Sequence, residues 1–197
     1  LRYYPGETNM IMADIAIINK VDSADTDQVK RVRKNIEKHA PNADIVLAES
    51  AVFVDNPDLI RGKRVLVVED GPTLTHGGMP FGAGTIAAKL YGAASIVDPR
   101  PYSSGTIKET FEKYSHIGPL LPAMGYSKKQ IHDLEVTINK VDCERVLFAT
   151  PIDLPKLVSI DKPTLRVYYE YRDHGRPVLE EVLLNRLDKY VGNSTIL

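Results

Sequence analysis

A short apolar run near the start of the chain constrains its fold most strongly. Residues 13–18 are rich in Ile and have the length of a strand, and continuous apolar runs of this kind are typical of buried parallel strands. The run leads into Asn19-Lys20-Val21-Asp22, where the chain must turn. Because α/β proteins bind ligands at the carboxyl ends of parallel strands, this polar segment is a candidate ligand site.

The chemistry of this segment suits a purine base. The Asp22 carboxylate can accept two hydrogen bonds from the N1–H and 2-amino groups of guanine, whereas adenine has no donor at N1. Asn19 can bond the base edge and the local backbone, while the stem of Lys20 lies on the base face with its ammonium in water. The alternative is a polar turn in which Asp22, Ser23 or Asp25 caps the next helix.

The letters Ile-Asn-Lys-Val-Asp recur at residues 138–142 and allow an internal comparison. The apolar residues around this second copy have helical spacing: Ile131, Leu134, Ile138 and Val141. The second copy is therefore predicted to end a helix. No strand delivers it to the ligand edge of a sheet, so no nucleotide site is expected there.

A helix and a second strand extend the first strand into one βαβ unit. The helix is expected to begin at Asp25 or Thr26 and to run to about His39, and the second strand is predicted at residues 44–48. A single βαβ unit is too small to form a domain. Residues 1–56 are therefore expected to be the C-terminal remnant of a larger nucleotide-binding domain.

The two strand ends together resemble the base site of P-loop GTPases. In these proteins Asn-Lys-x-Asp directly follows a strand, as Asn19 to Asp22 do here. The loop after the next strand also contacts the base, through a backbone N–H near a Ser-Ala-like pair. Ser50-Ala51, in the loop predicted after the second strand, is a second element of the same site. The resemblance implies a P-loop nucleotide-binding domain.

The composition excludes several classes of protein. The chain has 197 residues, 43% hydrophobic and 26% charged, with a net charge of −1, so neither nucleic acid nor an acidic membrane is an expected partner. No transmembrane run or signal peptide is visible. The single Cys143 fits a reducing cytoplasm, which is the expected location. The five histidines are scattered, so no metal site is expected.

The remainder of the chain, residues 57–197, is predicted to be a second domain. Strand and helix patterns alternate through residues 57–190, which favours an α/β fold with a three-layer, parallel, Rossmann-like sheet.

A glycine-rich loop at residues 71–85 is the second candidate site. It follows the strand at residues 63–70 and leads into an apolar helix at residues 86–91. Glycines let backbone N–H groups approach a ligand, and the helix offers its N-terminus to an anion. The alternative is a long mobile loop. The predicted anion or substrate site comprises Asp70, Thr75, His76, Gly77, Gly78, Gly82, Gly84, Thr85 and, from the next strand end, Arg100.

The loop can be compared with two known nucleotide-binding motifs. No Gly-x4-Gly-Lys-Ser/Thr of the Walker A type occurs in the chain, so the element that grips nucleotide phosphates is absent from this sequence. Gly82-Ala83-Gly84-Thr85-Ile86-Ala87 matches the Gly-x-Gly-x-x-Ala of NAD-binding folds. However, the match lies too far beyond the strand for the tight first turn, which leaves NAD binding as a lesser alternative.

Three segments together carry a resemblance that is more specific than either nucleotide motif. They are residues 68–79, which contain Gly-Pro-Thr-x-Thr-His-Gly-Gly-Met, Gly82-Ala83-Gly84, and the Asn19–Asp22 segment. Over its full length the chain resembles the archaeal and bacterial family of cyclic 2,3-diphosphoglycerate synthetase and its relatives, which are often labelled predicted GTPases. The resemblance implies the C-terminal part of a longer protein whose Walker A lies upstream. The family enzyme uses ATP to close an intramolecular phosphoanhydride in 2,3-diphosphoglycerate.

The resemblance implies a nucleotide-dependent phosphotransfer enzyme or ligase, or a related GTPase. GTP or ATP with Mg²⁺ would serve the complete enzyme, and this chain alone would require no cofactor. The expected partners are a phosphorylated small molecule and either a missing N-terminal half or another copy of the chain. The alternative is a non-catalytic α/β module that binds a phosphorylated metabolite.

Overall fold

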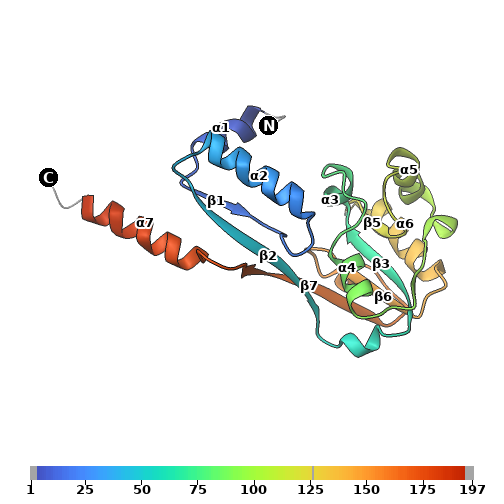
Figure 1. The fold of residues 1–197 in the computed structure, drawn as a ribbon. Helices are drawn as coiled ribbons and strands as arrows, with labels where there is room; N and C mark the ends of the chain where they lie inside the picture. The colour runs from blue at the N-terminus through green and yellow to red at the C-terminus, as the bar shows by residue number, and fades with distance from the viewer. Residues whose placement is uncertain (1–3, 126, 194–197) are drawn as a thin grey trace. The chain divides into compact units, whose positions relative to one another are not determined.

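The computed structural model describes residues 4–125 and 127–193 (Figure 1). The strands are β1 (Ile15–Ile18), β2 (Asp44–Val54), β3 (Arg64–Asp70), β4 (Ser95–Ile96), β5 (Leu121–Ala123), β6 (Arg145–Ala149) and β7 (Thr164–Asp173). The α-helices are α1 (Tyr4–Ile11), α2 (Thr26–His39), α3 (Gly71–Thr75), α4 (Ala83–Leu90), α5 (Gly105–Lys113), α6 (Lys128–Lys140) and α7 (Leu179–Asn193). The chain has an α/β fold with a mostly parallel sheet in a Rossmann-like arrangement, as the sequence predicts.

The described residues form two compact units. The first unit consists of the described parts of Leu1–Ala51 and Glu170–Leu197, and the second unit is Val52–Tyr169. The contacts thus group the end of the chain with its beginning. The predicted domains at residues 1–56 and 57–197 stay a prediction.

In the second unit, β3 is the central strand. It pairs in parallel with β6 along one edge and with β4 and β5 along the other, and β6 pairs in parallel with β7. Val65, Leu66, Val67 and Val68 of β3 are fully buried. A parallel strand that is covered on both faces needs this continuous apolar run. The helix α4 packs on β3 and β6, and α5 packs on α6.

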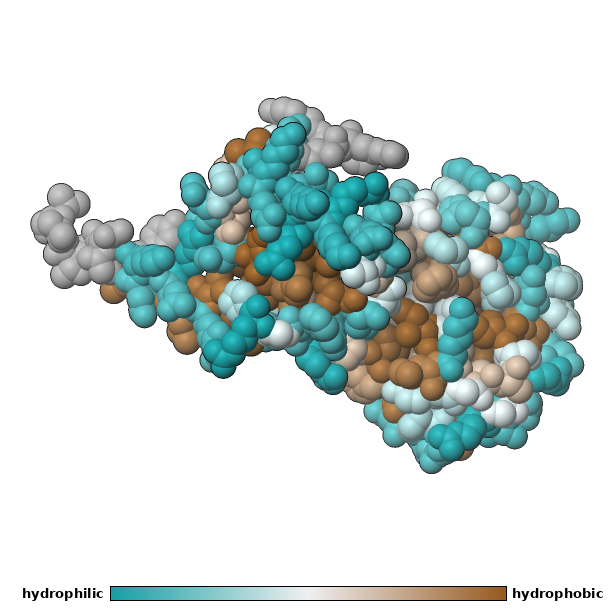
Figure 2. All heavy atoms as spheres, in the orientation of Figure 1, coloured by the Kyte–Doolittle hydropathy of each residue, from teal (hydrophilic) through white to brown (hydrophobic). Residues whose placement is uncertain are grey.

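In the first unit, β1 pairs in parallel with β2, and Ile15 lies opposite Asp44 while Ile18 lies opposite Leu47. The helix α2 packs Ile36 against Ile18 of the strand, in a small cluster with Ala40. Its outer face is polar, and Figure 2 shows the hydrophilic surface that this face presents.

The ends of the first unit's elements are fixed by polar side chains. Asp25 caps the N-terminus of α2, because its carboxylate accepts hydrogen bonds from the backbone N–H groups of Asp27 and Gln28. The predicted start of this helix is therefore confirmed. On α7, Arg186 donates to Asp44 at 2.8 Å and to Asp14 at 3.1 Å, which ties the helix to the starts of β2 and β1.

Two local predictions were wrong. The strand predicted at residues 44–48 continues to Val54, because Val52, Phe53 and Val54 favour extended backbone, so Ser50 and Ala51 lie within β2 and not in a loop. The loop predicted at residues 71–85 begins with the five-residue helix α3. Asp70 caps that helix, and Pro72 fits its first turn.

Candidate functional site

The predicted base site lies in the first unit, where β1 ends in a tight turn. Lys20 has a φ of 63°, in the left-handed region that residues other than glycine rarely adopt. The backbone N–H of Lys20 donates to Oδ1 of Asn19 at 2.8 Å. The Lys20 carbonyl in turn accepts from the N–H groups of Ser23 and Ala24. Asn19 thus bonds the local backbone as predicted, and the turn leaves Asn19, Lys20 and Asp22 exposed.

The structure brings Asp22 together with Ser50, which is 28 residues away in the sequence. The backbone N–H of Ser50 donates to Oδ1 of Asp22 at 3.3 Å, and the N–H of Val21 donates to the carbonyl of Ala48 at 3.1 Å. The turn therefore runs beside β2. Since Asp25 caps α2, Asp22 has no capping role there. Its carboxylate is held at the edge of the sheet, next to the Ser50–Ala51 backbone.

The second copy of the motif has a different environment. The helix α6 ends at Lys140, and Asp142 forms a bidentate ion pair with the Arg64 guanidinium at 2.9 and 3.1 Å. This ion pair and hydrogen bond hold the pKa of Asp142 below its usual range. Asn139 bonds the backbone of Ser159 and Asp161. These contacts confirm that the second copy ends a helix.

The glycine-rich segment of the second unit contains a residue that the sequence analysis missed. Glu69, the residue before Asp70 on β3, is only 2% exposed. Its Oε1 accepts hydrogen bonds from the backbone N–H groups of Gly82 at 3.1 Å and Thr85 at 2.9 Å. The N-terminus of α4 is therefore satisfied by a carboxylate of the chain itself. Burial raises the pKa of Glu69, and the backbone N–H groups of Thr85, Gly84 and Gly82 oppose that rise because they favour the charged form.

The close approach of this carboxylate explains two of the glycines. A Cβ atom on Gly82 would lie 2.5 Å from Oε2 of Glu69. A Cβ atom on Gly84 would lie 2.8 Å from Cγ1 of Val67 and 3.3 Å from Oε1 of Glu69. Glycine is thus required here for internal packing, whether or not a ligand also approaches.

The other residues predicted for this site also have partners within the chain. Oδ2 of Asp70 accepts from the N–H and hydroxyl of Thr73, at 3.3 and 2.8 Å. The hydroxyl of Thr75 donates to the Gly71 carbonyl at 3.0 Å, and its oxygen lies 3.3 Å from Nδ1 of His76. Gly77 packs closely, since a Cβ atom there would lie 2.4 Å from the Thr73 carbonyl oxygen.

Gly78, by contrast, has free space around its Cα atom. It has a φ of +63°, and a Cβ atom there would meet no atom within 4 Å.

Arg100, predicted as an anion clamp, is held by its neighbours. Its Nη1 pairs with the Asp98 carboxylate at 3.0 Å, and its Nη2 donates to the carbonyl of Ile117. The guanidinium lies 4.8 Å from the centre of the Phe111 ring. Anion binding stays a prediction for the site made of Asp70, Thr75, His76, Gly77, Gly78, Gly82, Gly84, Thr85 and Arg100. Within residues 4–125 and 127–193, no three His, Cys, Asp or Glu side chains gather where they could hold a metal ion.

No helix in the described part of the chain is both long and apolar enough to cross a membrane.

No protein-family model matches the sequence. The chain is similar to arginine synthetase ArcE of Thermococcus kodakarensis, with 57% identity over 183 residues, which cover 93% of this chain. They cover 41% of ArcE, so the chain spans less than half the length of this relative. A synthetase name denotes a ligase-type enzyme, which agrees with the ligase prediction at that level.

Proposed function

We propose that this chain supplies the base-binding part of a nucleotide-dependent ligase, and that the product of this ligase is arginine. The observation that carries the nucleotide site is the hydrogen bond from the Ser50 N–H to the Asp22 carboxylate. The observation that favours arginine is the 57% identity to a protein named arginine synthetase.

The geometry at the end of β1 supports the nucleotide site in a specific way. The hydrogen bond from Ser50 fixes one carboxylate oxygen of Asp22 without placing a cation against it. An exposed carboxylate held in this way is a suitable acceptor for paired donors on the edge of a base, and guanine has such a pair. GTP is therefore the nucleotide that we favour over ATP.

Ligases couple the cleavage of a nucleoside triphosphate to the formation of a bond, so the phosphates and Mg²⁺ must also be held. The chain has no Walker A motif, and it spans 41% of ArcE. We assign the phosphate site to the part of the longer enzyme that lies outside this sequence. Cyclic phosphoanhydride formation is a second candidate reaction, which the Gly71–Met79 resemblance favours.

Substitution of Asp22 tests the nucleotide site. Asp22→Ala is expected to weaken GTP binding by about 1–3 kcal/mol, because it removes a charged acceptor from the base. Calorimetric titration of the chain with GTP and with ATP measures this change. Asp142→Ala, in the duplicate motif, is the matched control and is expected to leave GTP affinity unchanged. Equal losses from the two substitutions, or no GTP binding by the unaltered chain, would overturn the proposal.

The arginine assignment needs a separate measurement. The full-length protein that contains this sequence should form arginine only when GTP or ATP is supplied, and chromatography of the amino-acid products measures this. Arginine formation without nucleotide would remove the ligase assignment while leaving the base site intact.

A further inference from the structure

The first unit holds a histidine in a fixed position directly after β7. The backbone N–H of His174 donates to the carbonyl of Leu47 in β2 at 2.9 Å. The preceding residue, Asp173, accepts from the N–H of Leu179 at 2.8 Å and from the hydroxyl of Tyr171 at 2.7 Å. These bonds fix the backbone on both sides of His174 and attach it to β2.

The ring of His174 is fixed as well. Its Nδ1 lies 2.7 Å from Oε1 of Glu49, and the side chains of His174 and Glu49 are 51% and 24% exposed. A carboxylate only accepts hydrogen bonds, so Nδ1 is the donor. This bond lies in the plane of the ring. One edge of the imidazole is therefore held by a partly covered partner, while about half of the His174 side chain is exposed to solvent.

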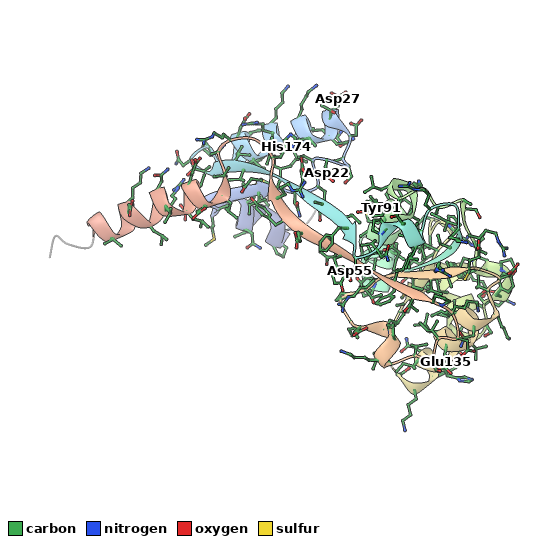
Figure 3. All side chains as sticks on the ribbon, turned by 90° about the horizontal axis from the view of Figure 1, so that it is seen from below. Asp22, Asp27, Asp55, Tyr91, Glu135 and His174 are labelled. Atoms are coloured by element: carbon green, nitrogen blue, oxygen red, sulfur yellow. The ribbon has the colours of Figure 1, made fainter. Side chains whose placement is uncertain are left out.

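This histidine is attached to the same short stretch of β2 as the predicted base site. Glu49 bonds His174, and the next residue, Ser50, bonds Asp22. Figure 3 labels Asp22 in the turn after β1 and His174 at the end of β7. The strands β1 and β7 flank β2 in the sheet. Since neighbouring strands lie about 4.8 Å apart, the backbones of these two strands are separated by about 10 Å. A purine nucleoside is comparable in length to that separation.

We propose that His174 is a stacking platform for the nucleoside whose base edge Asp22 binds, and that Glu49 is the positioning residue that orients its ring. The inference rests on the proposed nucleotide site and extends it from one contact to two. An aromatic ring that is held at one edge and half exposed can stack on any base, because every base has a π-face. Asp22 then selects the base by its edge, and His174 adds affinity without selecting.

A titration with GDP, followed by calorimetry and by NMR of the histidine rings, tests the inference. His174→Ala is expected to weaken GDP binding about 5- to 150-fold, the range found for loss of one base-stacking contact. GDP should also shift the ring signals of His174. His132→Ala, at an exposed histidine of the second unit, is the matched control and should leave GDP affinity unchanged.

His174→Phe separates stacking from a structural role. Phenylalanine cannot bond Glu49 but keeps an aromatic face, so stacking predicts that His174→Phe recovers most of the affinity lost in His174→Ala. Glu49→Gln should lower GDP affinity by less than His174→Ala, because it disturbs only the orientation of the ring.

Equal affinities of His174→Ala and the unaltered chain would overturn the inference, as would equal losses from His174→Ala and His174→Phe. Shifts at Asp22 and Ser50 without any shift at His174 would overturn this inference alone. GDP that shifts no signal of the chain would overturn both this inference and the proposed function.

Discussion

The carboxylate of Glu69 should control the stability of the second unit, and two substitutions separate its contributions. Both hydrogen bonds from Gly82 and Thr85 reach the same oxygen, Oε1. Glu69→Ala removes this acceptor and leaves the buried N–H of Thr85 and the partly buried N–H of Gly82 unpaired. A buried unpaired group costs about 1–3 kcal/mol and the partly buried one up to that amount, so the free energy of unfolding should fall by about 1–6 kcal/mol. Glu69→Gln keeps an acceptor oxygen at that position and should cost much less.

The pH dependence of stability gives a sharper test. Burial raises the pKa of Glu69 in the folded state above its unfolded value of about 4.3. The folded chain then binds the proton more tightly than the unfolded chain. The resulting stabilisation is fully present below the unfolded pKa, and it is lost as the pH rises through the folded pKa. Each unit of pKa difference corresponds to about 1.36 kcal/mol.

Urea unfolding at a series of pH values between about 4 and 8 measures this linkage. The unaltered chain should lose stability relative to Glu69→Gln as the pH rises, because Gln does not titrate. Glu112→Gln, at an exposed position of α5, is the control and should keep the slope of the unaltered chain. Identical pH slopes for the unaltered chain and Glu69→Gln would refute the assignment of a raised pKa to Glu69.

Two further predictions follow from the glycine-rich segment and from the missing phosphate motif. Gly84→Ala places a Cβ atom 2.8 Å from Val67 Cγ1 and should lower the free energy of unfolding by about 1–3 kcal/mol, as measured by urea unfolding. Gly6→Ala, where a Cβ atom meets nothing within 4 Å, should be neutral or stabilising by up to about 1 kcal/mol, and a larger loss there than at Gly84 would contradict the packing argument. The 197-residue chain should release no phosphate from GTP or ATP in steady state, because its sequence has no Walker A motif; sustained release by the pure chain would exclude this prediction.

The parts of the fold that depend on local patterns were predictable from the sequence. The apolar run at residues 65–68 predicted a strand, and the strand pairing then shows that it is the central strand of the second unit. Ser127 before α6 forms a capping box with Gln130, as residue preferences for helix starts suggest. Short elements were not predictable in the same way. The strand β5 has only three residues and contains Pro122, so its pattern is too short to show a period, and its pairing with β3 defines it.

The candidate sites differ in what the sequence could show. The turn after β1 was predictable because the strand and the polar residues are adjacent. To predict that Asp22 lies next to Ser50 also required the resemblance to GTPases, since the two residues are 28 positions apart. Glu69 was missed because a charged residue at a strand end is usually expected to face solvent, and only the packing of Gly82 and Gly84 shows that this one is buried.

The two copies of Ile-Asn-Lys-Val-Asp show why the element that carries a motif decides what the motif does. In the second copy, Asp142 forms a bidentate ion pair with Arg64, and Asn139 of the same copy bonds the backbone of a neighbouring loop. A ligand would have to compete with both arrangements. In the first copy, Asp22 accepts one hydrogen bond from a backbone N–H, which orients the carboxylate and leaves its charge uncompensated by a cation among the described residues. A donor pair on a base can therefore bind Asp22 without first breaking an ion pair, and the same five letters support a ligand site only at the end of β1.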